Sequence, residues 1–477
     1  MDRIIDEIVK VSVKDAIASA TVTSLNTAAV VGVTDKDGAK TQVAYDQNEV
    51  EEAYETGEKR VIFIEPTLSG TLASGDVELE CSGNVVATAK IKVGDSASTV
   101  RTLVKDLASD FNSGKPGKGV PGYKAVASAT KITITSEAYG ATAAEDGAFT
   151  IDYNGTGFSG SPNNTDGVDG ADIVLVTKAF FQEEANPGKL VCIPVATDPS
   201  GSDIADTLEA AIAMGKDDNH RDIDFYHVIV RLGSGATSAK VVSLAVALDE
   251  WCRENFRFGH IEVQDRAVAE DAIAALVENN IKRVAIYFHD EESGKACAAA
   301  TVADRCGNDS AKGTWALKTF SSIVADPTSK ANFKDAQSLG LNLYVKVSGV
   351  DSLYFGTVCA PDKFIDSVMK QDWVKFNAQI AIFDALRKGN SGAGITFNDD
   401  GIQDVVTALT KVGTTAADKD HMYIMDDADH EFNVEAPKYK DIPKADRDVR
   451  NLPKVKMTFS IMDFLHTVKT VEIQVVD

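Results

Sequence analysis

The sequence predicts an α/β protein (α+β overall): an α/β core, a β-rich α+β domain inserted into it, and an extended β-strand arm at each end of the chain. Strand and helix patterns alternate between residues 171 and 360, which is typical of parallel strands joined by helices. Residues 66–170 have a different texture, rich in Gly, Ser, Thr and Ala. Both termini alternate apolar and polar residues, which is the period of a strand with one buried face.

The chain begins with a predicted arm at residues 1–20, followed by the first part of the core at residues 21–65. In the run IVKVSVK the arm places Val9, Val11 and Val13 on one side of an extended segment. The runs TAAVVGVT and RVIFIE predict two strands of the core. Because acids interrupt the apolar residues of the arm and no small-residue cleavage site follows, we expect no secretion signal.

The inserted domain is predicted at residues 66–170, with the strand-like runs VELEC, VVATAKIKV and TKITITS. One helix pattern, SASTVRTLVKDLASDF, has apolar residues at helical spacing, among them Val100, Leu103, Leu107 and Phe111. Regular alternation of strand and helix resumes after the domain, so we interpret it as an insertion into the core.

The second part of the core is predicted at residues 171–454. Helix patterns such as AKVVSLAVALDEWCREN alternate there with buried strand patterns such as FYHVIVRL and KRVAIYF. A hairpin follows at residues 341–359, then a long helix at 362–389 and a shorter helix at 399–413. Residues 417–448 form a polar connection that leads to the terminal strands.

The C-terminal strands, or arm, are predicted at residues 455–477. Val471, Ile473 and Val475 alternate there with polar residues and share one side of an extended segment. Domain termini usually fray unless something holds them, so a terminal strand needs a partner strand. That partner belongs either to the same subunit or to a neighbouring one.

Composition and charge limit the function. A chain of 477 residues is long enough for two or three domains. Its net charge of −24 repels phosphate, so we expect no direct nucleic-acid partner. No run approaches the roughly 20 apolar residues of a membrane span, so we expect no membrane insertion. The 6 dispersed cysteines indicate reduced, structural thiols in a protein made in the cytoplasm.

The sequence contains no pattern typical of an enzyme. GNSGAGIT (389–396) lacks the lysine of a phosphate-binding loop, and the histidines and cysteines show no zinc spacing. The acidic run MDDADHEF (425–432) lacks the glycine and the distal glutamate of a calcium loop, so a solvated loop is predicted. We therefore expect no catalytic residue, no cofactor and no metal site.

The last third of the chain resembles a known family. The extended LNLYVKVSGV and its hairpin precede the long helix, a Gly-rich break with ITFNDDGI, a further helix and alternating terminal strands. In this order, over residues 1–65 and 171–477, the chain resembles the tail sheath proteins of contractile-tailed bacteriophages (the myovirus-type tail sheath family). Their long helix carries an FID…DW stretch and their next segment a T/D-x-G-I turn. The matching positions are Phe364, Ile365, Asp366, Asp372, Trp373, Thr396, Asp400, Gly401 and Ile402.

The resemblance implies a non-enzymatic virion subunit, made in the cytoplasm of the bacterial host. It would polymerise around a tail tube and contract to drive the tube through the host envelope for genome delivery. The implied partners are other copies of the chain, in stacked hexameric rings of a helical sheath, with the tail tube protein, the baseplate and the tail terminator. The arms would add strands to sheets of neighbouring subunits, and the inserted domain would face outward.

Four other interpretations stay open. Both termini can pair within their own subunit. A cytoplasmic α/β enzyme with an inserted lid domain predicts a pocket near Arg231 or His289, at the carboxyl ends of the strands. A tail-tube or baseplate component is a third interpretation, although tube proteins are usually smaller and antiparallel. The sheath of a phage-derived bacteriocin or injection system would share the same fold.

Overall fold

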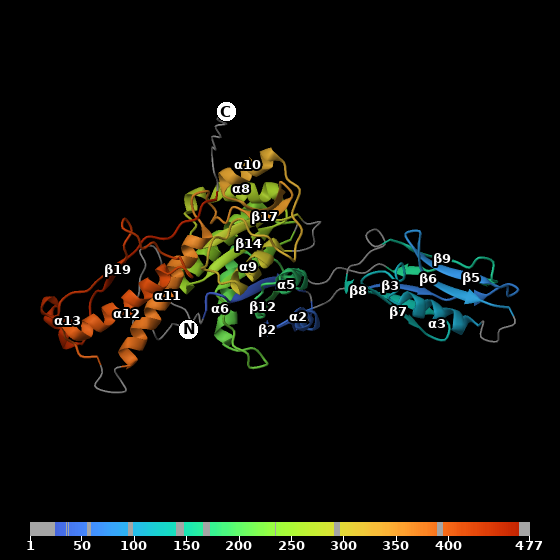
Figure 1. The fold of residues 1–477 in the computed structure, drawn as a ribbon, viewed down its shortest axis with the longest axis horizontal. Coiled ribbons are helices and arrows are strands. Elements are labelled where there is room, and N and C mark those ends of the chain that lie inside the picture. Colours follow the sequence, from blue (N-terminus) through green and yellow to red (C-terminus); the bar gives the residue numbers. More distant parts are fainter. Residues whose placement is uncertain are drawn as a thin grey trace, which may run out of the picture. The chain divides into compact units, whose positions relative to one another are not determined.

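The chain divides into two compact units in the computed structural model (Figure 1). The core unit comprises Met1–Tyr54 and Asp172–Asp477, and the inserted unit comprises Glu55–Ala171. The structure describes residues 24–34, 36, 38–54, 59–93, 99–139, 147–165, 172–233, 235–290, 296–388 and 395–466.

The core unit is built on a mixed eight-stranded sheet in the order β17-β16-β15-β14-β13-β1-β12-β2. The six strands from β16 to β12 run parallel, and the two edge strands run antiparallel to their neighbours. This sheet confirms the α/β class and the parallel strands predicted from the sequence. Its strands are β1 (Ala28–Val33), β2 (Gln42–Ala44), β12 (Leu190–Val195), β13 (His227–Leu232), β14 (Phe258–Val263), β15 (Val284–Phe288), β16 (Asn342–Val347) and β17 (Val350–Tyr354).

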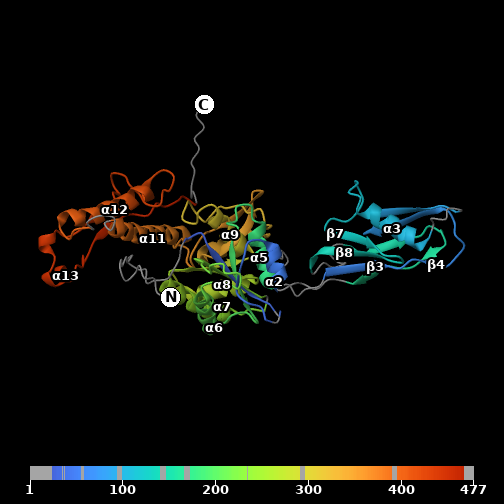
Figure 2. The same ribbon diagram turned by 90° about the horizontal axis from the view of Figure 1, so that it is seen from below.

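Helices lie on both faces of this sheet (Figure 2): α2 (Gln47–Tyr54), α5 (Asp172–Gln182), α6 (Gly201–Met214), α7 (Ser238–Asn255), α8 (Arg266–Leu276), α9 (Cys297–Gly307) and α10 (Lys330–Leu339). Gly259 of β14 faces α7, where an added Cβ would lie 2.6 Å from Cδ2 of Leu248. Glu262 is three residues further along β14 and therefore on the opposite face. There it accepts a hydrogen bond from the backbone N–H of Ala298 on α9 (2.7 Å). Both faces of the parallel strands are thus buried, as their continuous apolar runs require.

The inserted unit leaves the core unit after α2 and returns to it at α5. These two helices pack against each other, and Gln47 Nε2 of α2 donates to the backbone carbonyl of Val174 on α5 (3.1 Å). The chain therefore departs and returns on neighbouring helices of one face.

The end of the core unit forms a separate group of elements, residues 365–466, which we call the C-terminal module. Figures 1 and 2 show α13 at the end of this module farthest from the large sheet. The hairpin and the two helices predicted from the sequence are confirmed, as β16–β17, α11 and α12. The elements of the module are α11 (Ile365–Lys388), α12 (Asp399–Ala417), β18 (Asn433–Glu435), α13 (Lys444–Asp448) and β19 (Lys456–Thr458).

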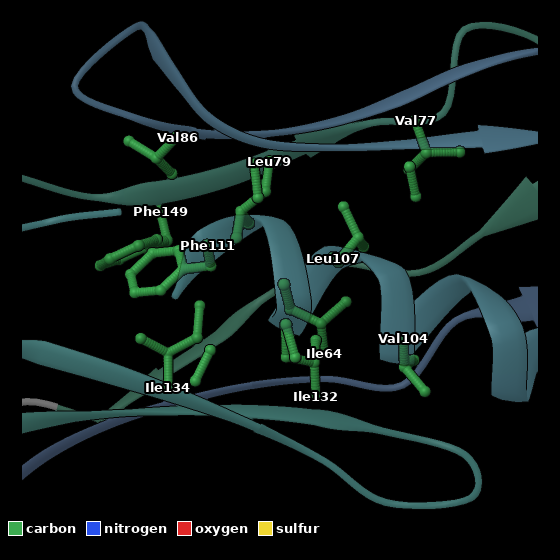
Figure 3. Packing of buried hydrophobic residues seen from close by; sticks show 14 of the residues in the cluster. Ile64, Val77, Leu79, Val86, Val104, Leu107, Phe111, Ile132, Ile134 and Phe149 are labelled. Atoms are coloured by element: carbon green, nitrogen blue, oxygen red, sulfur yellow. The ribbon is translucent and has the colours of Figure 1, made fainter. Parts of the chain in front are cut away.

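The inserted unit is built from short antiparallel sheets around one helix, α3 (Val100–Phe111). Figure 3 shows Val104, Leu107 and Phe111 of α3 gathered with apolar residues of the strands in one core. A four-stranded sheet has the order β11-β3-β8-β7, a three-stranded sheet the order β6-β5-β9, and β10 pairs with β4. The strands are β3 (Lys59–Ile64), β4 (Thr67–Leu68), β5 (Gly75–Cys81), β6 (Asn84–Ile91), β7 (Tyr123–Ala127), β8 (Ile132–Tyr139), β9 (Phe149–Asp152), β10 (Phe158–Ser159) and β11 (Asn163–Thr165).

The expected start of the insertion at residue 66 differs from the structure. β3, which we assigned to the core, pairs with β8 and β11 of the inserted unit. Its side chains Ile62 and Ile64 are fully buried there. The run RVIFIE reads as a buried strand in either sheet, so its pattern alone could not assign it. Among the described residues, no helix is long and apolar enough to cross a membrane.

Candidate assembly surface

The C-terminal module contains a two-stranded antiparallel sheet, β18–β19, that no other strand of the described chain extends. The pairs are Asn433 with Thr458, Val434 with Met457, and Glu435 with Lys456. The polar side chains of these pairs are exposed, whereas Val434 and Met457 are half-buried. Two strands alone are marginally stable in water, and a third strand commonly supplies what they lack. Both outer edges of this sheet are therefore candidate positions for further strands.

One end of the sheet is fixed to the rest of the module. Backbone pairing continues beyond it, because Met425 N–H donates to the carbonyl of Ser460 (2.9 Å) and Met462 N–H to that of Tyr423 (3.0 Å). The chain before β18 also packs on α12 through Phe432. The Phe432 ring lies so near the helix that a Cβ added at Gly413 would be 2.4 Å from it.

The edges of the large sheet, in contrast, are covered by the same chain. Leu353 of β17 exchanges two backbone hydrogen bonds with residues 317–318 (2.7 and 2.8 Å). At the other edge, Val43 N–H of β2 donates to Oδ2 of Asp217 (3.1 Å), and Nη1 of Arg221 donates to the Val43 carbonyl (2.6 Å). Covered edges do not accept strands from another molecule. In the described part of the core unit, β18–β19 is the sheet whose edges lack such cover.

Five of the positions that match the family pattern are called the family-like residues here: Phe364, Asp366, Asp372, Trp373 and Gly401. Asp372 lies in a buried ionic contact between α11 and the large sheet. Its carboxylate accepts two hydrogen bonds from the guanidinium of Arg283 (2.7 and 2.8 Å) and a further one from the hydroxyl of Tyr226. All three side chains are buried. Burial raises the pKa of Tyr226 well above its usual range, and the Asp372 charge adds to this effect. The contact holds α11 on the sheet and shows no catalytic arrangement.

Asp366 and its neighbour Lys370 fix the C-terminal segment to α11. Lys370 Nζ donates to Oδ2 of Asp366 (3.2 Å) and to the carbonyl of Met462 (2.5 Å). The same ammonium lies 4.4 Å from the centre of the Phe464 ring. Burial lowers the pKa of Lys370, and the Asp366 charge opposes that shift. One buried cation thus orients the chain just before its last residues.

Phe364 lies at the start of α11 and also contacts the C-terminal segment. Its ring meets the ring of His466 edge to face, with 5.0 Å between the centres. Nε2 of His466 lies 2.8 Å from Oγ1 of Thr314, on the core. Phe364 therefore helps to hold the C-terminal segment, at His466, on the core.

The remaining family-like residues, Trp373 and Gly401, hold the two helices in place. The Trp373 ring packs on Tyr423 with 4.8 Å between the centres. Gly401 donates its N–H to Oδ1 of Asn398, which caps α12 (3.0 Å). A Cβ at Gly401 would lie 1.8 Å from the carbonyl oxygen of Thr396, so this position requires glycine. These five residues do not converge on one site; they join the helices of the module to the core and to the C-terminal segment.

A cavity of about 560 Å³ lies where the start of α11 meets the C-terminal segment. Its charged lining is mixed, and it is partly made by side chains already paired within the chain. Its lining residues include Lys282, Arg283, Lys363, Asp366, Asp463 and His466. The cavity is therefore a feature of the junction between the arm and the core.

The residues predicted to make intersubunit contacts lie outside the described residues: Val9, Val11 and Val13 of the N-terminal arm and Val471, Ile473 and Val475 of the C-terminal arm. Their role stays a prediction. Among the described residues, no further strand extends β18–β19, so this sheet is a candidate partner for them.

The charged side chains at the carboxyl ends of the parallel strands pair with one another. Arg231 lies 3.3 Å from Glu262 and 3.4 Å from Asp172, and His289 lies 2.9 Å from Asp326. Burial raises the pKa of Asp172 to about 6. The cavity at α11 is lined by neither Arg231 nor His289. Within the described ranges, no group of three His, Cys, Asp or Glu side chains could hold a metal ion.

Sequence reasoning missed the partners of the family-like residues and missed β18. Lys370 follows Asp366 by four residues on a predicted helix, a spacing that signals an ion pair. Arg283 and Tyr226 directly precede β15 and β13 and are distant from Asp372 in the sequence, and no local pattern indicates them. β18 has three residues within a polar connection, which is shorter than any periodic signal.

No family model matches the sequence, and no curated protein matches it. Among solved structures, the chain is similar to a chain of the anti-feeding prophage (AFP) baseplate, with a TM-score of 0.45 and 10% identity over 64% of this chain and 80% of that chain. It is also similar to a chain of the PVC sheath complex, an extracellular contractile injection system in the contracted state, with a TM-score of 0.44 and 11% identity over 63% and 80%. At these identities they assign no function to this chain.

Proposed function

We propose that this protein is the structural subunit of a contractile phage tail sheath, which polymerises around the tail tube by exchanging terminal strands between subunits. The observation that carries the proposal is the β18–β19 sheet, which no further strand of the described residues extends, whereas described residues of the same chain cover the edges of the large sheet. Val434 and Met457 are half-buried on this sheet, so an added strand would gain both backbone and side-chain contacts.

The arms have the properties that such an edge requires. Each alternates apolar and polar residues, with Val9, Val11 and Val13 in one and Val471, Ile473 and Val475 in the other. In β-augmentation, main-chain hydrogen bonds provide the linkage and alternate side chains set the register. A strand that makes about four hydrogen bonds, at roughly 0.5–1.5 kcal/mol each, contributes several kcal/mol before the cost of ordering the arm. Because every subunit offers two arms and two edges, such links build a continuous mesh.

In this arrangement the arms link the subunits, and the rigid units are the parts that move. The C-terminal arm departs from a fixed point, since Lys370, Phe364 and Thr314 hold residues 462–466 on the core. Strand links persist while the rigid units change their mutual contacts, which is a common form of large transition. The proposed cycle is assembly in an extended state, followed by contraction that forms larger contacts and drives the tube through the host envelope. The tail tube protein, the baseplate and the tail terminator are its further partners in the virion.

The proposal is tested by removing one arm from the full chain. Deletion of residues 469–477 is expected to abolish the formation of long hollow tubes, observed by negative-stain electron microscopy across a range of salt concentrations. The core unit should remain folded. Tryptophan fluorescence measures this, because all three tryptophans, Trp251, Trp315 and Trp373, lie in that unit.

A matched pair of variants tests whether the apolar face of the C-terminal arm, and not only the presence of these residues, is needed for assembly. Changing Val471, Ile473 and Val475 to Ser removes the apolar face and should act like the deletion. Changing Glu472 and Gln474 to Ser alters the other face and should leave tubes intact. Normal tubes from the truncated chain would refute strand exchange, and an unfolded truncated chain would show that the strand pairs within its own subunit.

A further inference from the structure

Charge is segregated along the C-terminal module. Residues 418–435 carry seven carboxylates and one lysine, whereas residues 438–456 carry seven Lys or Arg and three carboxylates. The first stretch precedes and includes β18, and the second includes α13 and reaches β19. In a chain with a net charge of −24, a cationic stretch of this length is unusual.

The antiparallel pairing brings like charges to the same end of the module. Because Glu435 pairs with Lys456, the residues after β18 and the residues before β19 lie at one end. That end therefore collects Lys438, Lys440 and Lys454 with α13, and we call it the basic end. Asp399 of α12 also lies there, because its Oδ1 accepts a hydrogen bond from the backbone N–H of Tyr439 (2.7 Å). The acidic run 426–431 precedes β18 and so lies at the other end, the acidic end.

The charges at both ends are available to another molecule. At the basic end, the side chains of Lys438, Lys440, Lys444, Arg450, Lys454 and Lys456 are exposed, and no ion pair engages any of them within the described chain. At the acidic end, Asp426, Asp429 and Glu431 are likewise exposed and lack a cationic partner there. Asp427 is the exception, since the hydrogen bond from His430 holds the pKa of its carboxyl below the usual range.

We propose that the basic end of one subunit docks on the acidic end of the next copy, which gives the assembly its direction. This inference rests on the proposed function and names the contact that orients it. Two basic ends repel each other, as do two acidic ends, so the favoured contact joins unlike surfaces. Contacts of that kind are head-to-tail and continue into rings or helices. Complementary charge mainly sets partner choice and register, which is what strand exchange between identical chains requires.

A second copy fits the basic end better than a nucleic acid does. The complementary acidic stretch is present in every copy and on the same module, with a net charge of −6 (seven carboxylates and one lysine) against +4 for the basic stretch (seven Lys or Arg and three carboxylates). Phosphate, in contrast, is repelled by the net charge of −24. Two copies of this acidic chain also repel each other, but salt at 0.1 M limits that repulsion to about 10 Å. The attraction between a basic end and an acidic end in contact acts within this range.

The experiment reverses the charge of each end in the full chain. The basic-end variant carries Lys440→Glu, Lys444→Glu and Lys454→Glu, and should form at least tenfold less sedimentable polymer than the parent. Its matched control carries Lys90→Glu, Arg101→Glu and Lys105→Glu on exposed positions of the inserted unit. The control has the same net charge and should polymerise like the parent, which separates the basic end from total charge.

The acidic-end variant carries Asp426→Lys, Asp429→Lys and Glu431→Lys. By itself it should also form at least tenfold less sedimentable polymer than the parent. A chain with all six changes has both ends exchanged and should polymerise again, as should an equimolar mixture of the two variants. Failure of both of these to polymerise, with tryptophan fluorescence showing folded chains, would overturn the proposal. Capture of a labelled oligonucleotide by the parent in place of polymer would overturn it as well. If the parent chain itself forms no polymer, the proposed function fails, and the two failures are thereby distinguished.

Discussion

The contact between Asp372 and Arg283 offers a direct test of how the C-terminal module is held on the core. Asp372→Asn keeps the shape of the side chain but removes the charge that accepts two hydrogen bonds from Arg283, at 2.7 and 2.8 Å. The guanidinium then stays buried without a counterion, because its side chain is only 4% exposed. Removing one partner of a buried pair typically costs about 3–5 kcal/mol. We expect a loss of about 3 kcal/mol, since asparagine still accepts one hydrogen bond.

The assay is urea unfolding of the core unit followed by tryptophan fluorescence. With a slope of about 3 kcal/mol per molar urea, the midpoint should fall by about 1 M. Asp384→Asn on the same helix is the matched control, because Asp384 pairs with Arg387 at 3.1 Å in a largely exposed contact. Exposed pairs contribute about 0–1 kcal/mol, so the control midpoint should hardly move. Equal shifts for the two variants would refute the role given to Asp372.

Two further predictions concern packing and pH. Gly413→Val should displace the Phe432 ring, which lies 2.4 Å from an added Cβ, and should reduce tube formation several-fold by loosening β18. Thr414→Val at the next, exposed position is the control, and equal tube formation by both variants would contradict the packing argument. In the core, burial lowers the pKa of His227 to about 3 and that of His260 well below its usual value. The unfolded chain binds protons at these residues below pH 6.5 while the folded chain does not, so stability is complete above pH 6.5. It should fall by up to about 1.4 kcal/mol per pH unit and per imidazole as the pH drops toward 3. Urea midpoints between pH 7 and pH 5 measure this, with fluorescence of Trp315, which stacks on His260 at 5.4 Å, as a local probe. An unchanged slope in His260→Gln would contradict the assignment.

The parallel core could be predicted because its signals are local. The strand at His227–Leu232 is buried at every position, and apart from His227 and Arg231 its residues are apolar and lie between helix patterns. The long helix α11 likewise carries its own periodicity. Elements of that kind can be recognised from the sequence within a window of about ten residues.

The rest depends on contacts between distant residues. β3 has the same pattern whichever sheet it joins, so its unit was assigned wrongly. The five family-like residues were identified by position, but their partners were not, because Arg283 and Tyr226 lie about ninety and one hundred and fifty residues before Asp372. β18 has three residues and therefore no periodicity to detect, although the sheet that it forms with β19 carries the proposed function.

The junction of α2 and α5 gives the chain a modular architecture. Because the inserted unit departs and returns on helices that touch each other, its replacement by another folded body with adjacent ends leaves the large sheet and its covered edges untouched. Natural selection can therefore exchange this unit without changing the surfaces that we propose to build the polymer. The same junction is a rational place to graft a fluorescent or affinity domain, which would display one copy of the grafted domain on every subunit of the proposed assembly.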